Sequence, residues 1–366
     1  MKYLYLLVII IVLIVSCDRD DTPKYTQNTA LLRFETKNAV WTKTKALGTD
    51  YTGDTGGNPI PDMVIYGYYT GVLEWINIYN SVSPSFMNGI EITNNNGVWS
   101  YSPLRYFFPT GYHSFFAFAP YQSIIANENN SFIINDNVGV AKLNYNLPAN
   151  VSDYPDLLFG WKTDVTQATN ESTPVNIQFM HITSRITFSA CINTNFQVNY
   201  PNTSVQIKSI TLSNIYSAAQ ASIKYNTTTE NNVTGISGVS WTIPNDYTKR
   251  RDIYISIDDN TLNSLSLTTT MTSISATSLF LIPQQLANRE QGGGIPTITI
   301  AVDVNNSGES EIKSQTFDLS ALSASWQPGN AINYQITYSG SGETPIGLFV
   351  DPGTGDPDDL QPPLGN

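Results

Sequence analysis

Residues 175–192 read VNIQFMHITSRITFSACI, and the apolar alternation of this stretch changes phase halfway along it. The first apolar set is odd-numbered and consists of Val175, Ile177 and Phe179, with His181 in phase. The second set is even-numbered and consists of Ile186, Phe188, Ala190 and Ile192. Because the side chains of a strand alternate between the two faces of a sheet, one flat strand cannot place both sets in one core. The chain therefore has to bulge, bend or change sheet between His181 and Arg185, and we predict that residues 182–184 separate two β-domains.

The composition of the whole chain favours β-structure. Its 366 residues are enough for two domains of about 150 residues each. Hydrophobic residues make up 41% and charged residues only 13%, and there are 21 tyrosines. Most polar side chains are Asn, Thr, Ser or Gln, which suit strands and turns better than surface helices. No long helical period occurs. The spacing of strand and turn signals therefore predicts an all-β fold of two tandem β-sandwich domains, with few or no long helices.

The net charge of −12 argues against a nucleic-acid-binding protein. Such proteins carry a basic patch or stripe, and the sequence contains none. We expect the acidic surface to favour solubility.

The N-terminus has the features of a lipoprotein export signal. Lys2 precedes a short, almost wholly apolar run at 3–15. A bilayer-spanning helix needs about 20 such residues, so this run is too short to span a bilayer and fits the apolar region of a secretory signal. Residues 13–17 read LIVSC and resemble a bacterial lipobox, in which a peptidase cleaves before the cysteine and the thiol carries the lipid. We predict cleavage between Ser16 and Cys17 and a lipid on Cys17, whose several acyl chains make a stable anchor. An ordinary signal peptide with an accidental cysteine is the alternative.

The chain divides into segments of different character. The predicted segments are a signal peptide at 1–16, an acidic tether at 17–29, an N-terminal β-sandwich at 30–183, a C-terminal β-sandwich at 184–338 and a Gly/Pro/Asp-rich tail at 339–366. The first strand is expected at 30–35, with Ala30, Leu32 and Phe34 on one face, and an exposed basic loop follows at 41–61. The tail is expected to be flexible. Its apolar segment at 346–350 is either a donor strand or an unstructured segment.

No residue pattern in the chain predicts catalysis. His113 and His181 are in phase with apolar strand positions, so we expect both in the core. No cluster has His and Cys at metal-ligand spacing, and there is no G-x-S-x-G elbow or phosphate-binding glycine loop. Residues 303–308 (DVNNSG) copy half of a calcium loop, but Ser314 replaces the required Glu, which favours a hairpin turn. We expect no catalytic residue, no metal and no cofactor apart from the lipid on Cys17.

Cys191 is expected to be an inert thiol. If Cys17 carries a lipid, Cys191 has no partner and the chain has no disulfide. It lies on the strand face opposite Phe188 and Ala190, where we expect partial exposure. A reactive thiol needs an electropositive setting, which the sequence does not provide.

Several short motifs follow one another along the mature chain. They are 97–103 (GVWSYSP), 106–109 (YFFP), 115–120 (FFAFAP), 156–158 (DLL), 179–186 (FMHITSRI), 281–286 (LIPQQL) and 326–329 (WQPG) before Asn333 and Tyr334. Together with the lipobox and the acidic tether, their order and spacing resemble the fimbrillin family, which comprises the pilin, tip and anchor subunits of Bacteroidetes-type pili. The resemblance covers most of the mature chain.

This resemblance implies two transthyretin-like sandwiches in a cell-surface lipoprotein of the outer membrane. In polymerising members a trypsin-like protease removes the first strand with its lipid, and a strand of another subunit fills the emptied groove. Here the removable strand would be residues 30–35, with the cut between Lys45 and Ala46 or at Lys43. The family offers Arg in a Thr-Arg-Ala context, whereas this chain has Thr44-Lys45-Ala46. A retained lipid anchor is therefore the alternative to processing.

Three functions are compatible with the sequence. The first is a non-enzymatic fimbrial subunit (stalk, tip or anchor) that binds other pilus subunits by β-strand complementation and joins the fimbrium once processed. The second is an unprocessed lipid-anchored adhesin for a host protein or a glycan. The third, a β-sandwich hydrolase, lacks a recognisable set of catalytic residues, although carboxylate pairs cannot be identified from sequence spacing alone.

Overall fold

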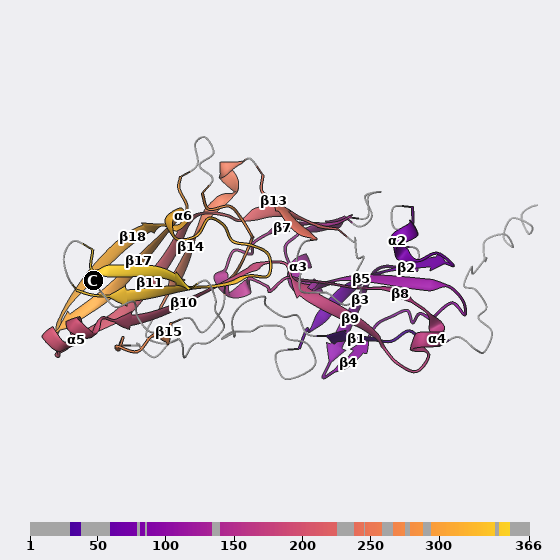
Figure 1. Ribbon diagram of the computed structural model, residues 1–366, viewed down its shortest axis with the longest axis horizontal. Helices are drawn as coiled ribbons and strands as arrows, with labels where there is room; N and C mark the ends of the chain where they lie inside the picture. The colour runs from indigo at the N-terminus through magenta and orange to yellow at the C-terminus, as the bar shows by residue number, and fades with distance from the viewer. Residues whose placement is uncertain are drawn as a thin grey trace, which may run out of the picture.

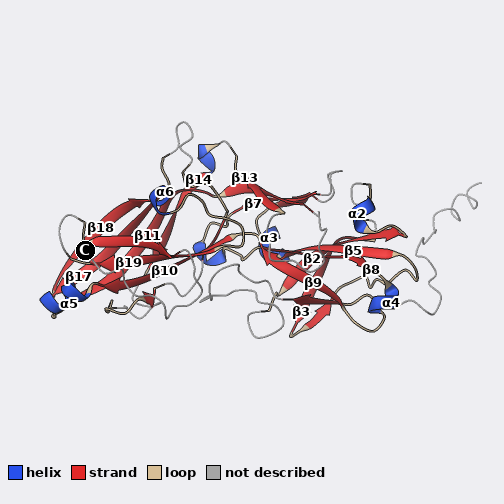
Figure 2. Cartoon of the chain, viewed as in Figure 1, coloured by secondary structure: helices blue, strands red, loops and turns tan. Residues whose placement is uncertain are grey.

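The computed structural model shows a chain built almost entirely of strands (Figures 1 and 2). It describes residues 30–37, 59–78, 81–84, 86–133, 140–224, 238–244, 246–257, 266–274, 279–287, 294–340 and 344–351. Several predicted sites lie outside these ranges, namely Ser16, Cys17, Lys43, Lys45 and Ala46. The same holds for the signal peptide at 1–16, the tether at 17–29, and residues 41–58 and 352–366.

The first sheet lies at the right of Figure 1. Within the described residues it has seven strands, in the order β1 (Phe34–Lys37), β9 (Val175–His181), β8 (Leu158–Val165), β5 (Tyr112–Ala119), β2 (Asp62–Gly71), β3 (Met87–Asn95) and β4 (Val98–Ser100). Only β1 and β9 are parallel among these neighbouring pairs. Phe115 and Ala117 of β5 enter one hydrophobic core, and Phe116 and Phe118 enter another. The sheet is therefore buried on both faces, which explains why β5 is apolar on both.

Two further sheets lie at the left of Figure 1. One contains β15 (Thr272–Ser273), β10 (Ser184–Ile192), β19 (Ala331–Tyr338) and β20 (Ile346–Asp351), with β16 (Leu279–Leu281) also paired to β10. The other contains β14 (Arg250–Ser256), β11 (Thr203–Tyr216), β17 (Thr297–Asn306) and β18 (Glu309–Asp318). Phe188 of β10 and Leu212 of β11 belong to one core, so the two sheets pack as a sandwich.

The fourth sheet joins strands from both halves of the sequence. Its order in the described residues is β13 (Val239–Thr242), β12 (Ala218–Lys224), β7 (Val140–Asn146) and β6 (Ser131–Ile133). Strand β7 precedes the predicted boundary at 183–184, and β12 follows it. The larger hydrophobic core also draws residues from both sides of this boundary. The division into domains at 30–183 and 184–338 therefore stays a prediction.

The helices that the structure describes are short connectors. They are α2 (Trp75–Ile78), α3 (Tyr121–Ile125), α4 (Gln167–Asn170), α5 (Thr194–Asn199), α6 (Leu319–Leu322), η1 (Val151–Asp153) and η2 (Tyr247–Lys249). In the described part of the chain, no helix has the length and apolar composition to cross a membrane. The all-β sandwich class with few helices is thus confirmed.

The change of phase in residues 175–192 is a change of sheet. Strand β9 ends at His181, the chain bends at Thr183, and β10 starts at Ser184 in a different sheet. Ile177 and Phe179 pack in the smaller core, whereas Ile186 and Phe188 pack in the larger one. The predicted break at residues 182–184 is confirmed at the level of sheets.

Both histidines are buried, as predicted. His181 is 1% exposed and its Nδ1 lies 2.8 Å from Oδ1 of the equally buried Asp156. His113 is 0% exposed, and its Nε2 accepts a hydrogen bond of 3.2 Å from the backbone N–H of Phe108. Neither ring is accessible to a substrate.

The hairpin turn predicted at residues 303–308 is present, and a second hairpin turn joins β3 to β4. Asn96 and Gly97 have φ of 54° and 87° between β3 and β4, and Ser307 and Gly308 have φ of 55° and 100° between β17 and β18. Two successive positive φ angles are typical of the type I′ turns that match the twist of a hairpin. Among the described residues, no group of three or more His, Cys, Asp or Glu could hold a metal ion.

Two sequence predictions were wrong. Cys191 is buried rather than partly exposed, and the hydroxyl of Thr337, its neighbour on β19, lies 3.6 Å from its Sγ. Burial raises the pKa of this thiol. The tail from 339 is not wholly flexible, because residues 346–351 form β20 and pair with β19. Ile346 and Leu348 of β20 are buried in the larger core, which supplies the stabilisation.

We predict that His113 makes folding stability dependent on pH. Burial lowers its pKa from 6.5 to about 4, so protonation favours the unfolded chain. The stabilisation is complete above pH 6.5 and is lost as the pH falls towards 4, by about 3 kcal/mol in all. Urea denaturation at pH 7.0, 5.5 and 4.5 measures this slope.

The matched variant is His113→Gln, whose carbonyl oxygen can replace Nε2 as the acceptor for Phe108. It is expected to flatten the slope between pH 4.5 and 6.5, because the titrating ring is removed while the hydrogen bond from Phe108 can be kept. An unchanged slope in His113→Gln would show that this histidine does not titrate on unfolding.

Candidate functional site: the groove of the first strand

The segment 30–37 lies in a groove at the edge of the seven-stranded sheet and changes its partner along its length. Leu31 forms an antiparallel bridge with Tyr106, and the backbone N–H of Leu32 donates to the carbonyl of Arg105 at 3.0 Å. Further along, β1 pairs in parallel with β9, from Phe34 opposite Val175 onwards. The observed strand thus begins and ends later than the predicted 30–35, because the residues before Phe34 pair with the connection between β4 and β5.

Three alternate side chains of this segment point into the smaller core. Leu32, Phe34 and Thr36 are 1%, 5% and 5% exposed. The ring of Phe34 makes edge contacts with Phe115 at 5.3 Å and Tyr101 at 5.9 Å between centroids. The predicted inward face of Ala30, Leu32 and Phe34 agrees with this placement, with Ala30 partly buried against the same core.

The opposite side of the segment lies at the rim of the groove. Arg33 is exposed, and its Nη2 donates to the carbonyl of Ser172 at 3.2 Å. The side-chain amide of Asn176 donates to Glu35 at 2.7 Å, and the hydroxyl of Tyr101 donates to the carbonyl of Leu32 at 2.8 Å. These polar contacts fix the register of the segment, while its two apolar side chains supply most of the stabilisation.

The magnitude of this stabilisation is moderate. Burying a Leu or Phe side chain contributes about 1.5–3 kcal/mol each, so the pair contributes roughly 3–6 kcal/mol. Thr36 subtracts from this sum, because its buried hydroxyl has no hydrogen-bond partner among the described residues. An unsatisfied buried hydroxyl costs about 1–3 kcal/mol. The groove therefore holds a strand that fits well at Leu32 and Phe34 and less well at Thr36.

Without this segment the groove would be an apolar slot beside an open strand edge. Phe107, Phe115, Val175 and Ile177 line the same core and are fully or almost fully buried with the segment in place. Strand β9 would also lose the backbone partners that β1 supplies. An open edge next to exposed apolar side chains binds an added strand. In this structure the site binds a strand of its own chain.

The alternation of Ala30, Leu32 and Phe34 predicted the inward face of the segment, whereas the residues that contact the segment were not predicted. Tyr101 and residues 105–107 complete the groove, and Thr36 extends the inward face of the segment. The 106–109 motif marked part of this region, without indicating that it pairs with the first strand. Lys43, Lys45 and Ala46 follow β1 in sequence and lie outside the described residues.

We predict that Phe34→Ala lowers the free energy of unfolding by about 3 kcal/mol, because it removes a buried ring between two aromatic neighbours. Thr36→Val is expected to raise it by about 1 kcal/mol, because the unsatisfied hydroxyl is replaced by a methyl group. Urea denaturation of the full mature chain measures both changes.

The control is Arg33→Ala at the exposed neighbouring position, which is expected to change stability by less than about 0.5 kcal/mol. Equal stability of Phe34→Ala and Arg33→Ala would mean that the segment contributes nothing to the fold.

Comparison with solved structures supports the observed fold. A fimbrial protein from Bacteroides vulgatus is 17% identical, with a TM-score of 0.52 over 88% of this chain and 98% of its own. A putative cell adhesion protein from Bacteroides uniformis is 14% identical, with a TM-score of 0.45 over 88% and 97%. One from Bacteroides ovatus is 13% identical, with a TM-score of 0.46 over 89% and 97%. At these identities the likeness concerns the fold alone, and only the first score supports it.

The family is shown by the sequence match. No curated protein matches this chain. The fimbrillin-like family, however, matches over residues 71–352, which is most of the sequence. This agrees with the resemblance drawn from the sequence motifs. The chain belongs to the fimbrillin-like family.

Proposed function

We propose that this protein is a non-enzymatic cell-surface subunit of a pilus that assembles by strand exchange. The observation that carries the proposal is the first segment. It fills an apolar groove through Leu32 and Phe34, and it pairs with a sheet edge at β9. Family membership supports a pilus or cell-adhesion role at the cell surface. Removing the segment and refilling its groove from another subunit would join two subunits without new chemistry.

The anchor in this proposal is a lipid on Cys17, added after cleavage between Ser16 and Cys17. The tether at 17–29 separates the lipid from Ala30. Fully extended, it would reach about 45 Å at ~3.5 Å per residue. The protein would therefore sit close to the outer membrane until the first segment is cut away.

The cut in this proposal falls between the end of β1 at Lys37 and the first residue of β2, Asp62. Within that interval the candidate bonds follow Lys43 and Lys45, the latter preceding Ala46. A cut at either position would separate Leu32 and Phe34 from the rest of the chain. The freed groove would then accept a strand of another pilus subunit.

The second candidate function is an adhesin that keeps its lipid anchor. The observation that favours it is the lack of any Arg in residues 38–61, where the family offers one to its protease. In this case the first segment would stay in its groove, and the surface of the folded chain would bind a host protein or a glycan.

We predict that a Lys-specific protease, applied to the mature chain, produces a core beginning between residues 38 and 46. This core is expected to form ladders that resist SDS, because each emptied groove takes up a strand from another copy. An Arg-specific protease should leave residues 38–61 intact and produce no ladder. N-terminal sequencing identifies the start of the core, and electrophoresis without boiling detects the ladders.

Two variants sharpen this test. Lys43→Gln combined with Lys45→Gln should slow the trimming at residues 44–46, and Lys45→Arg should make the chain a substrate of the Arg-specific protease. Lys24→Gln in the tether is the matched control and should change neither result. A trimmed core that stays monomeric at high concentration would contradict strand exchange and favour the anchored adhesin.

A further inference from the structure

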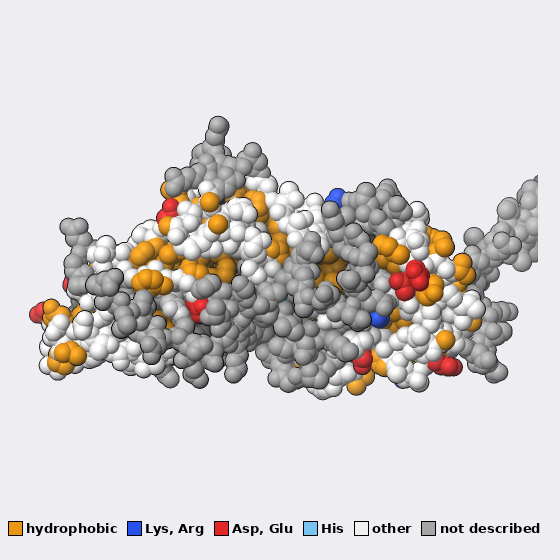
Figure 3. Space-filling view, in the orientation of Figure 1, with side chains coloured by type: hydrophobic (Ala, Val, Ile, Leu, Met, Phe, Trp, Pro, Cys, Tyr) orange, Lys and Arg blue, Asp and Glu red, His pale blue; other side chains and the backbone are white. Residues whose placement is uncertain are grey.

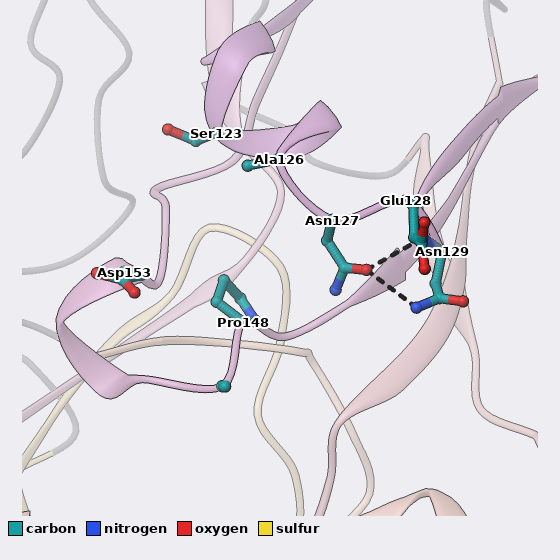
Figure 4. A pocket seen from close by; sticks show the side chains of 8 residues that line it. Ser123, Ala126, Asn127, Glu128, Asn129, Pro148 and Asp153 are labelled. Atoms are coloured by element: carbon teal, nitrogen blue, oxygen red, sulfur yellow. Dashed lines mark hydrogen bonds between the residues drawn. The ribbon is translucent and has the colours of Figure 1, made fainter.

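A polar cleft lies between the end of α3 and the segment that contains η1 (Figure 4), and none of its lining residues belongs to the groove of the first strand. Its volume is about 690 Å³, within the range of about 300–1,000 Å³ typical of ligand sites. Ser123, Asn127 and Glu128 line it from the α3 side, and Pro148 and Asp153 from the other. Ala126, Asn129 and Ala149 complete the lining.

The α3 wall of the cleft is held in place by side-chain amides. The Asn127 side-chain oxygen accepts two hydrogen bonds from Asn129, one from its backbone N–H at 3.1 Å and one from its amide at 3.2 Å. The amide of Asn127 donates to the carbonyl of Asn146 on β7 at 3.3 Å. The turn after α3 is therefore fixed to the fourth sheet before any ligand arrives.

The opposite wall is fixed as well. The carboxylate of Asp153 accepts hydrogen bonds from Asn150 at 3.0 Å and from Ser152 at 3.1 Å. Arg251 of β14 donates to the carbonyl of Pro148 and to the hydroxyl of Tyr154. The wall is thus tied to the C-terminal sandwich, and Asp153 is oriented without using all of its lone pairs.

Polar groups in the cleft remain available to a ligand. Among the described residues, nothing hydrogen-bonds to the carboxylate of Glu128 or the hydroxyl of Ser123, and Asp153 keeps unused acceptor capacity. Ala126, Pro148 and Ala149 add small apolar surfaces between these groups. Carboxylate acceptors, a hydroxyl and small apolar patches suit a polyhydroxylated ligand, because its hydroxyl groups donate and accept while its C–H faces are apolar.

The charges in the cleft restrict the class of ligand. Two carboxylates disfavour an anionic ligand, such as a phosphate or an acidic sugar. Figure 4 shows Asp153 and Glu128 at opposite ends of the row of lining residues, with Asn127 between them. The two carboxylates therefore do not enclose one cation. An extended neutral ligand would instead meet an acceptor at each end and the α3 wall in the middle.

We propose that this cleft binds a neutral oligosaccharide. The proposal is independent of strand exchange, because the cleft contains no residue of the first segment or of its groove. It gives the folded chain an adhesive surface whether or not the first segment is removed.

The test uses the full mature chain and an array of neutral, basic and sialylated oligosaccharides, followed by titration calorimetry of each glycan that binds. We expect neutral glycans to bind and sialylated versions of the same glycans to bind at least tenfold more weakly. The double variant Glu128→Gln, Asp153→Asn keeps the shape of the cleft and should weaken binding at least tenfold. Ala149→Trp fills the cleft and should abolish binding.

Glu311→Gln, an exposed position on β18, is the matched control and should bind like the parent chain. Urea denaturation confirms that each variant is folded. Three outcomes would overturn the proposal: no neutral glycan binds, binding survives Ala149→Trp, or sialylated glycans bind equally well. Capture of a lysine-rich peptide, abolished by the carboxylate variant while neutral glycans fail, would instead assign the cleft to basic peptides.

Discussion

The change of strand phase at Ile182 and Thr183 is the constraint on which the arrangement of the cores depends. It lets one continuous segment line the smaller core through Phe179 and the larger core through Ile186. Leaving a sheet while buried exposes backbone groups that need partners. The indole N–H of Trp241 donates to the carbonyl of Ile182 at 2.7 Å, and the backbone N–H of Gly329 donates to the carbonyl of Thr183 at 2.8 Å. The backbone carbonyl groups at this change of sheet are therefore hydrogen-bonded by residues from distant parts of the sequence.

Much of the fold could be predicted from the sequence because strand alternation and turn chemistry are local. The phase change, the hairpin turn at 303–308 and the buried histidines followed from residues within a few positions of each other. The burial of Cys191 and the pairing of residues 346–351 could not, because both depend on strand β19 packing beside them. The Gly/Pro/Asp-rich composition predicted a flexible tail, although Ile346 and Leu348 alternate as in a strand.

Only the part of the groove that depends on local sequence could be predicted. The inward face of Ala30, Leu32 and Phe34 is a local pattern, whereas its walls come from β5, β9 and the connection after β4. The polar cleft gave no sequence signal, since Asn127 and Asp153 meet only through folding. Charged side chains are few and scattered on the described part of the face shown in Figure 3. A surface of this kind suits contacts based on backbone and amide hydrogen bonds more than on salt bridges.

We propose that residues 30–37 are a replaceable strand, held in the groove without needing their covalent connection to the rest of the chain. The direct measurement is the binding of a fluorescent peptide with the sequence of residues 30–37 to the protease-trimmed core, followed by anisotropy. The account predicts saturable binding that is lost when the position of Phe34 carries Ala and retained when the position of Arg33 carries Ala. Equal binding of all three peptides, or no binding of the natural one, would contradict it.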